Sequence, residues 1–266
     1  GSAATRIAGL IAGEVDVVLD PPLQDLARNY RAGLPLKVIG ITGSSGKTST
    51  KDFTAAVLGA RFRVMRTRGN LNNHIGLPLT LLEASSRDEI GILEMGMNHP
   101  GEIAPLAAIA RPDAAIITNI GVAHLEYMGS REAIAQEKGE LAIAVDASGF
   151  VVLNSGDDYT PTIAARIVAE PVLAGLSDDP VVPVRGHILE TGFASTRFRV
   201  TAGTETAEVL LPVPGGHMVE NALLALAAGV RFGVTLEEGA AALKESRLTK
   251  GRLEQKNFHG IHVLDD

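Results

Sequence analysis

Residues 36–145 alternate between short apolar runs and longer amphipathic runs, and no other feature of the sequence constrains the fold as strongly. The run at 36–42 is rich in β-branched residues, which favour a buried strand, whereas the run at 46–60 places Phe53 and Val57 at helical spacing. Strands that alternate with helices of 10–15 residues are typical of βαβ units. The sequence therefore predicts an α/β fold with a mostly parallel sheet and helices on both faces.

The individual elements follow from this pattern. Strands are predicted at 36–42, 62–65, 90–95, 114–120 and 150–154, and helices at 46–60, 75–84, 101–110 and 131–145. Short β-rich pieces at 181–184, 196–200 and 207–211 are predicted to add a few antiparallel strands to the edge of the sheet. Helices at 218–230 and 236–245 and a strand at 261–264 are expected after them, and a strand at 15–19 and a helix at 22–31 before residue 36.

The composition excludes several classes of function. Lys and Arg number 24 against 31 Asp and Glu, which gives a formal net charge of −7. No surplus of cations is available to neutralise phosphates, so we expect neither nucleic acid nor a membrane as a partner. The sequence has no Cys, which rules out disulfides, thiolate metal sites and Cys nucleophiles and fits a cytoplasmic protein.

A Gly/Ser-rich segment separates the first predicted strand from the helix after it. It consists of Thr42, Gly43, Ser44, Ser45, Gly46, Lys47, Thr48 and Ser49. Glycines let successive backbone N–H groups converge on phosphate oxygens, and a helix N-terminus adds partial positive charge. In a P-loop, Lys47 would reach the β- and γ-phosphates of ATP and the Thr48 hydroxyl would bind Mg²⁺. The segment is shorter than the usual pattern, since Ile41 stands in place of its first glycine, and a chance Gly/Ser turn is the alternative.

Polar residues also follow two further predicted strands. Glu94 ends the strand at 90–95, and His124 follows the strand at 114–120. The ligand crevice of an open α/β sheet lies beyond the carboxyl ends of its strands, so both side chains are expected beside the loop. A carboxylate there suits Mg²⁺, which prefers oxygen ligands, although a solvated strand end is an equally plausible reading of Glu94. From the residues alone, a solvated side chain is the favoured reading of Lys138, whereas the Asn-rich stretch at 70–73 suits either a polar ligand or a turn.

These segments together resemble the Mur ligases, the ATP-dependent amide-forming enzymes of peptidoglycan synthesis. The resemblance covers nearly all of residues 36–266. It rests on the loop at 42–48, Glu94-Met95-Gly96, Thr118-Asn119-Ile120-Gly121 with His124, Glu137-Lys138-Gly139-Glu140, Gly216-His217 with Asn221, and Gly251-Arg252-Leu253-Glu254. The sequences of residues 69–73 and 97–103 are most similar to the branch that adds D-alanyl-D-alanine to UDP-N-acetylmuramoyl-tripeptide, the MurF type. Met218 replaces the first Asn of one family motif.

The resemblance implies roles for individual residues. It makes Lys47, Glu94, His124 and Lys138 catalytic, with Thr48, Glu94, His124 and a carbamylated Lys138 holding the metal. It also implies that Asn221 binds the adenine of ATP, that Arg252 contacts the phosphates, and that Asn72 and Asn73 face the UDP-linked substrate. The implied reaction proceeds through an acyl phosphate, with ATP and Mg²⁺ as cofactors. The implied partners of the intact enzyme are small-molecule substrates, and a monomer is expected.

The family resemblance also implies a domain organisation. Residues 3–35 are expected to be the end of an N-terminal UDP-substrate domain, 36–264 the central ATP-binding domain, and 265–266 the start of a further domain. Such a chain is expected to be inactive as a ligase by itself. Alternatives are another ligase of the superfamily (another Mur or a folylpolyglutamate type), a non-catalytic nucleotide-binding partner subunit, or a small-molecule P-loop kinase.

Overall fold

The computed structural model describes residues 22–249, 254–258 and 261–265. The strands are β1 (Lys37–Thr42), β2 (Val64–Arg66), β3 (Ile90–Glu94), β4 (Ala114–Ile117), β5 (Phe150–Asn154), β6 (Glu170–Leu176), β7 (Val184–Thr191), β8 (Thr196–Ala202), β9 (Glu205–Leu211), β10 (Glu254–Phe258) and β11 (Ile261–Asp265). The helices are α2 (Leu23–Ala32), α3 (Lys47–Gly59), α4 (Gly76–Leu82), α5 (Ile103–Ala110), α6 (Leu125–Met128), α7 (Arg131–Ile143), α8 (Thr160–Ala164), α9 (Gly216–Arg231) and α10 (Leu236–Lys244).

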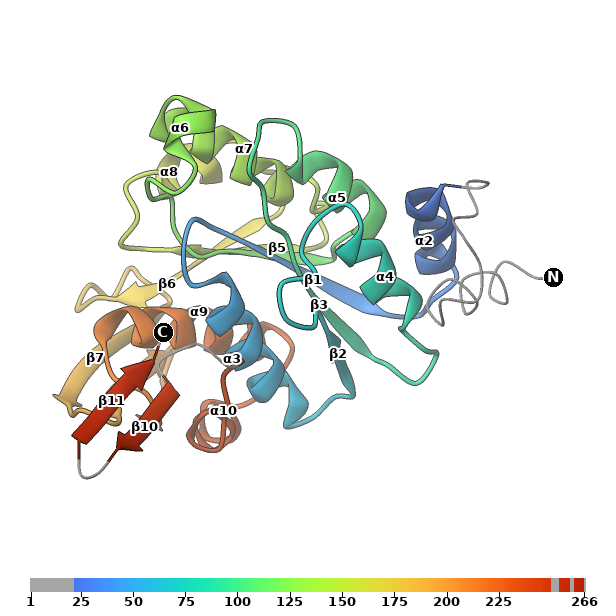
Figure 1. Ribbon diagram of the computed structural model, residues 1–266. Helices are drawn as coiled ribbons and strands as arrows, with labels where there is room; N and C mark the ends of the chain where they lie inside the picture. The colour runs from blue at the N-terminus through green and yellow to red at the C-terminus, as the bar shows by residue number, and fades with distance from the viewer. Residues whose placement is uncertain (1–21, 250–253, 259–260, 266) are drawn as a thin grey trace.

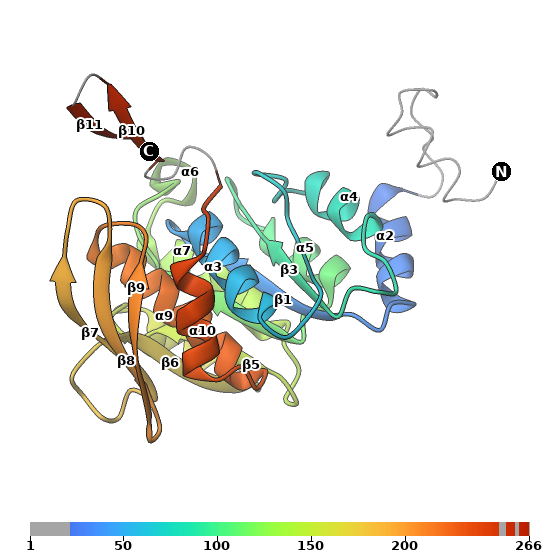
Figure 2. The same ribbon diagram turned by 90° about the horizontal axis from the view of Figure 1, so that it is seen from below.

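Nine of the strands form one mixed sheet in the order β2-β3-β1-β4-β5-β6-β7-β8-β9. Neighbouring strands from β2 to β7 pair in parallel, whereas β8 and β9 pair antiparallel at the end of the sheet opposite α2 (Figure 2). The predicted fold class is therefore confirmed, including the antiparallel edge. The phosphate-loop strand β1 lies between β3 and β4, so the carboxyl ends of these three strands meet at one edge.

One predicted strand was wrong. Residues 181–183 form a turn, because Asp179 accepts two hydrogen bonds there. Its side chain accepts from Val181 N, and its backbone carbonyl accepts from Val182 N. β7 begins only at Val184 and pairs parallel with β6 before it pairs antiparallel with β8. Sequence reasoning missed β6, whose segment contains both Pro171 and Gly175. It also missed β10, which pairs antiparallel with β11 in a separate two-stranded sheet.

Helices cover both faces of the main sheet, as expected. α3, α9 and α10 pack on one side, and α2, α4, α5 and α7 on the other (Figure 1). The side chains of β1 alternate accordingly, since Ile39 and Ile41 enter the first core and Val38 the second. Gly40 allows α7 to approach β1, because a Cβ there would lie 2.6 Å from Leu141 Cδ1. Each fully buried aliphatic side chain contributes about 1.5–3 kcal/mol, so these layers hold β1 and its carboxyl end in place.

The helix predicted at 22–31 is confirmed as α2, and it packs against α4 and α5. Ala27 is fully buried, and Arg31 Nε donates to Ala110 O at 2.9 Å. The strand expected at 15–19 lies outside the described residues, and the assignment of residues 3–35 to a preceding domain stays a prediction. None of the described helices has the length and hydropathy that crossing a membrane requires.

Candidate active site

The predicted phosphate loop connects the buried end of β1 to the first turn of α3. Gly46 precedes the helix with φ 77°, in the left-handed region that favours glycine, and a Cβ there would lie 2.5 Å from Asn221 Oδ1. Lys47 Nζ folds back over the loop and donates to Gly43 O at 2.8 Å. Thr42 is fully buried, and its hydroxyl donates to Met95 O at 2.9 Å. The local sequence therefore builds a tight loop that ends at a helix N-terminus, where anions bind favourably.

The segment after β4 holds this loop in shape. Ser44 N donates to Asn119 O at 2.9 Å, and Ser45 N donates to Asn119 Oδ1 at 3.0 Å. Thr118 Oγ1 donates to Ser45 O, and Gly121 N donates to Ser44 Oγ at 2.9 Å. Sequence reasoning had placed only His124 from this segment beside the loop; the contacts of Thr118 and Asn119 depend on the neighbouring positions of β1 and β4. Because Asn119 engages the amides of Ser44 and Ser45, the amides of residues 46–48 are the better placed phosphate donors.

Glu94 ends β3 directly beside β1, where Ile41 is its register partner. Its Oε1 accepts a hydrogen bond from Asn72 Nδ2 at 2.8 Å, and its Oε2 is buried with no hydrogen-bond partner among the described residues. Lys51 Nζ lies 3.7 Å from that same Oε2. The expected position of Glu94 beside the loop is thus confirmed, whereas the buried cation Lys51 was missed, since nothing in the helical pattern of 46–60 marks it.

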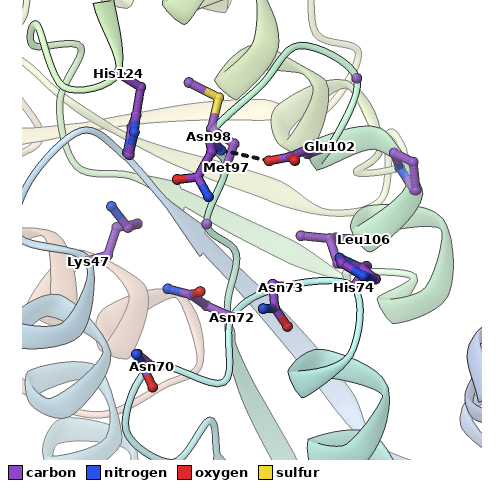
Figure 3. A pocket seen from close by; sticks show the side chains of 13 residues that line it. Lys47, Asn70, Asn72, Asn73, His74, Met97, Asn98, Glu102, Leu106 and His124 are labelled. Atoms are coloured by element: carbon purple, nitrogen blue, oxygen red, sulfur yellow. Dashed lines mark hydrogen bonds between the residues drawn. The ribbon is translucent and has the colours of Figure 1, made fainter. Parts of the chain in front are cut away.

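Two cavities meet at this site and share the residues Lys47, Asn70 and Asn72. The first, here called the loop cavity, has a volume of about 510 Å³ and is lined by the phosphate loop, Glu94 and the start of α9. The second, the histidine cavity, has a volume of about 600 Å³ and includes His124. Figure 3 shows Lys47, Asn72 and His124 approaching the histidine cavity from different elements. Lys47 therefore lies where a ligand of one cavity would meet a ligand of the other.

Three basic side chains, Lys47, His124 and Lys138, influence one another beside the histidine cavity. Burial and the cations Lys138 and Lys47 lower the pKa of His124, which precedes α6 in a left-handed conformation with φ 66°. Lys138, in α7, is almost fully buried, and burial followed by repulsion from Lys47 lowers the pKa of its amine to about 7. Glu102 and Glu126 oppose the shift at His124, and Glu137 opposes the shift at Lys138, but the net effect favours the neutral form of both groups.

The other predicted site residues are placed as follows. Thr48 and Ser49 line the loop cavity together with Asn221, which is buried in α9 and donates weakly from Nδ2 to Met218 Sδ at 3.8 Å. Asn72 and Asn73 both line the histidine cavity, but Asn73 Oδ1 also accepts from the amides of residues 75 and 76 at the start of α4. Arg252 lies outside the described residues. Within the part of the chain that the structure describes, no three His, Cys, Asp or Glu side chains group as metal ligands.

Comparisons with known proteins give both a family and named relatives for this sequence. The family described as the Mur ligase middle domain matches residues 41–229. The chain is 41% identical over 245 residues to the UDP-N-acetylmuramoyl-tripeptide–D-alanyl-D-alanine ligase of Bacillus subtilis, covering 92% of this chain and 52% of that protein.

Two solved structures are similar throughout the described fold. MurF from Acinetobacter baumannii gives a TM-score of 0.88 at 31% identity and covers 99% of this chain and 62% of that one. The MurF ligase from Thermotoga maritima in complex with ADP gives a TM-score of 0.81 at 28% identity and covers 95% and 60%. The chain spans about half the length of the curated relatives it matches. Because the family match at residues 41–229 takes in well over half of the 266 residues, the chain belongs to the Mur ligase middle domain family.

Proposed function

We propose that this chain is the ATP-binding part of a ligase that adds D-alanyl-D-alanine to UDP-N-acetylmuramoyl-tripeptide and releases ADP and phosphate. The observation that carries the proposal is the position of Lys47, which lines both the loop cavity and the histidine cavity. A phosphoryl group bound at Lys47 could pass from a nucleotide in one cavity to a carboxylate in the other. The names of the relatives supply the substrates, and they favour this reading over a kinase or a partner subunit.

The loop cavity is proposed to bind ATP. The amides at the start of α3 and the ammonium of Lys47 would hold the phosphates, because both present positive charge to them. Asn221 lies at the α9 side of the same cavity and would hydrogen-bond the adenine. Arg252 would contact the phosphates as a bidentate donor.

The residues around Glu94 fit the magnesium ion that the family implies. Glu94 Oε2 is a buried carboxylate oxygen without a hydrogen-bond partner among the described residues, and Thr48 lines the same cavity. One carboxylate and one hydroxyl are sufficient protein ligands, since Mg²⁺ usually completes its shell with phosphates and water. When bound, the ion would neutralise charge on the transferring phosphoryl group. Thr48 and Glu94 are therefore the proposed ligands.

The histidine cavity is proposed to receive the carboxylate that ends the UDP-linked peptide. In the first step, a carboxylate oxygen forms a bond to the γ-phosphorus while the bond to the β-γ bridging oxygen breaks, which releases ADP. In the second step, the neutral amine of D-alanyl-D-alanine forms a bond to the acyl carbon, and the bond from that carbon to the phosphate oxygen breaks. Phosphate leaves with the electron pair, and the nitrogen releases a proton to solvent. Lys47 and His124 would stabilise the anions that gather there. Asn72 and Asn73 are proposed to orient the substrate.

Lys138 is proposed to carry a carbamate. With a pKa of about 7, about half of its amines are neutral at pH 7 and can attack CO₂, which forms an N–C bond and releases a proton. The product is an anion that the ammonium of Lys47 would attract, and its oxygens would serve with the neutral ring of His124 as ligands of a second metal. We further propose that the protein is located in the cytoplasm, where ATP is available. It is proposed to be a monomer and to bind no nucleic acid.

The testing experiment is calorimetric titration of Mg·ATP into this chain and into Lys47→Ala. We expect binding in the first and a loss of roughly 100-fold or more in the second, since a charge-assisted contact to phosphate is removed. Lys37→Ala is the matched control, because Lys37 is exposed and pairs with Asp113. Equal affinity in both Lys variants would contradict the proposed loop. Ligation is expected only from a chain of the relatives' full length.

A further inference from the structure

Four charged side chains form a cluster beneath the nucleotide site. Lys51 Nζ lies 3.7 Å from Glu94 Oε2 and 3.8 Å from Asp52 Oδ1, and all three side chains are at most 2% exposed. Arg66, which is partly exposed, places a guanidinium nitrogen 3.6 Å from Asp52 Oδ1. Two cations therefore balance two anions, as buried charges require.

The cluster is held by charge with few hydrogen bonds. Glu94 Oε2 and Asp52 Oδ1 are both buried, and neither has a hydrogen-bond partner in the described part of the chain. Lys51 Nζ donates to Gly69 O at 3.4 Å. Such an arrangement adds little to stability by itself, since each charge has lost its hydration. It does make the position of Glu94 depend on Lys51, because the ammonium is the cation closest to the unpartnered oxygen.

The second carboxylate oxygen of Asp52 faces a different segment. Asp52 Oδ2 accepts from Thr249 N at 2.7 Å and from Thr249 Oγ1 at 2.8 Å. These two residues are 197 positions apart in the sequence. The bonds tie the segment after α10 to α3, one turn beyond the phosphate loop, and Thr249 directly precedes the segment 250–253 that contains Arg252.

We propose that Lys51 and Asp52 are positioning residues that couple the carboxylate of Glu94 to Thr249. One oxygen of Asp52 faces Lys51 and Arg66, and the other accepts hydrogen bonds from Thr249. A substitution at Thr249 therefore shifts the Asp52 carboxylate relative to the Lys51 ammonium. Lys51 in turn orients Glu94. The attachment of Thr249 to α3 then depends on the same charges that hold the carboxylate of Glu94. The inference rests on the proposed function only for the role of Glu94 toward Mg²⁺.

The test uses Thr249→Val, which removes one hydroxyl and keeps the backbone bond to Asp52. We expect it to weaken Mg·ADP binding about fivefold, as coupling energies between linked sites allow, while ADP in excess EDTA binds unchanged. Thr201→Val is the control, since that hydroxyl pairs with Thr206 at the exposed end of β8. In a double-mutant cycle, the loss of Mg·ADP affinity in Thr249→Val/Lys51→Met should be smaller than the product of the fold-losses in the two single variants.

A second readout does not depend on nucleotide. Hydrogen exchange of the peptide 245–249 should be about tenfold faster in Lys51→Met than in the unaltered chain, because Asp52 contacts both Lys51 and Thr249. If Thr249→Val and Thr201→Val bind Mg·ADP alike, or if exchange at 245–249 is unchanged in Lys51→Met, the coupling is overturned. Should the unaltered chain bind no nucleotide, the proposed function fails and the exchange measurement alone decides the coupling.

Discussion

Asn119 binds Ser45 of the phosphate loop through both ends of its amide. Its Oδ1 accepts from Ser45 N at 3.0 Å, and its Nδ2 donates to Ser45 Oγ at 3.0 Å and to Ser45 O at 3.2 Å. The loop is therefore shaped from outside its own sequence, by a residue that follows β4. A phosphate loop held in one conformation before its ligand arrives binds that ligand at a lower entropic cost.

Asn119→Ala should weaken Mg·ATP binding about tenfold and lower the free energy of unfolding by about 1–2 kcal/mol, because several partly exposed hydrogen bonds are lost. Asn119→Asp is the informative companion, since it retains the acceptor for Ser45 N but loses the donor and adds negative charge near the phosphates. We expect it to bind more weakly than the Ala variant at low salt. Calorimetry and urea unfolding measure both effects, and unchanged affinity in Asn119→Ala would contradict the role of this contact.

Gly46→Ala should be more destabilising than the same substitution at a glycine of positive φ whose added Cβ would meet no neighbouring atom. A non-glycine residue at positive φ costs about 1–2 kcal/mol, and at Gly46 the added Cβ would also lie 2.5 Å from Asn221 Oδ1. Gly233 has φ 85° and no heavy atom within 4 Å of an added Cβ, so Gly233→Ala is the matched control for the φ effect alone. Thermal unfolding should rank the two variants in this order. Equal destabilisation would mean that Asn221 moves aside at no cost.

Lys138 should make stability depend on pH when CO₂ is excluded. Its pKa of about 7 in the folded chain lies below the usual 10.5, so between these values the unfolded chain binds more protons and stability rises with pH. The slope is at most about 1.4 kcal/mol per pH unit, and below pH 7 this group adds no further change. Denaturation from pH 6 to 9 should show this contribution as the difference between the unaltered chain and Lys138→Met.

The same experiment with bicarbonate tests the carbamate. A modified Lys138 should add the mass of one CO₂ and reduce the pH slope, since the group no longer titrates as an amine. Lys138→Met should show neither change. Identical slopes in the unaltered chain and in Lys138→Met without CO₂ would show that the amine of Lys138 is not perturbed as the structure implies.

Asn72→Ala and Asn73→Ala should separate two roles within one loop. Asn72→Ala leaves the buried carboxylate of Glu94 without its hydrogen bond, which we expect to cost about 1–3 kcal/mol and to raise the Mg²⁺ concentration needed for ATP binding. Asn73→Ala removes the one oxygen that accepts from two amides at the start of α4, and it should cost about 1 kcal/mol with the Mg²⁺ dependence unchanged. Titrations at several Mg²⁺ concentrations distinguish them, and equal Mg²⁺ dependence would contradict the contact to Glu94.

Sequence by itself determined the elements around β1 and the chemistry of the loop. The apolar run at 36–42, the glycines at 43 and 46 and the amphipathic run at 46–60 are local signals, and each depends on neighbours a few residues away. The sequence also supplied Glu94 and His124, because parallel strands must end at one edge of the sheet. The strand prediction was wrong at 181–183, where hydrogen bonds to Asp179 form a turn within an apolar run. The half-exposed strand β6 was not predicted.

The tertiary structure alone decided which side chains support the loop. Asn119 meets Ser45 because β4 lies beside β1, and Thr249 meets Asp52 across 197 positions of sequence. It also buries Lys51 and Lys138, which read as ordinary solvated lysines in their helices. Helical periodicity reports which face of a helix is apolar, whereas the charge that a lysine meets depends on the strands packed over it. Burial and electrostatic coupling are properties of the packed layers, and for that reason only the assembled sheet reveals them.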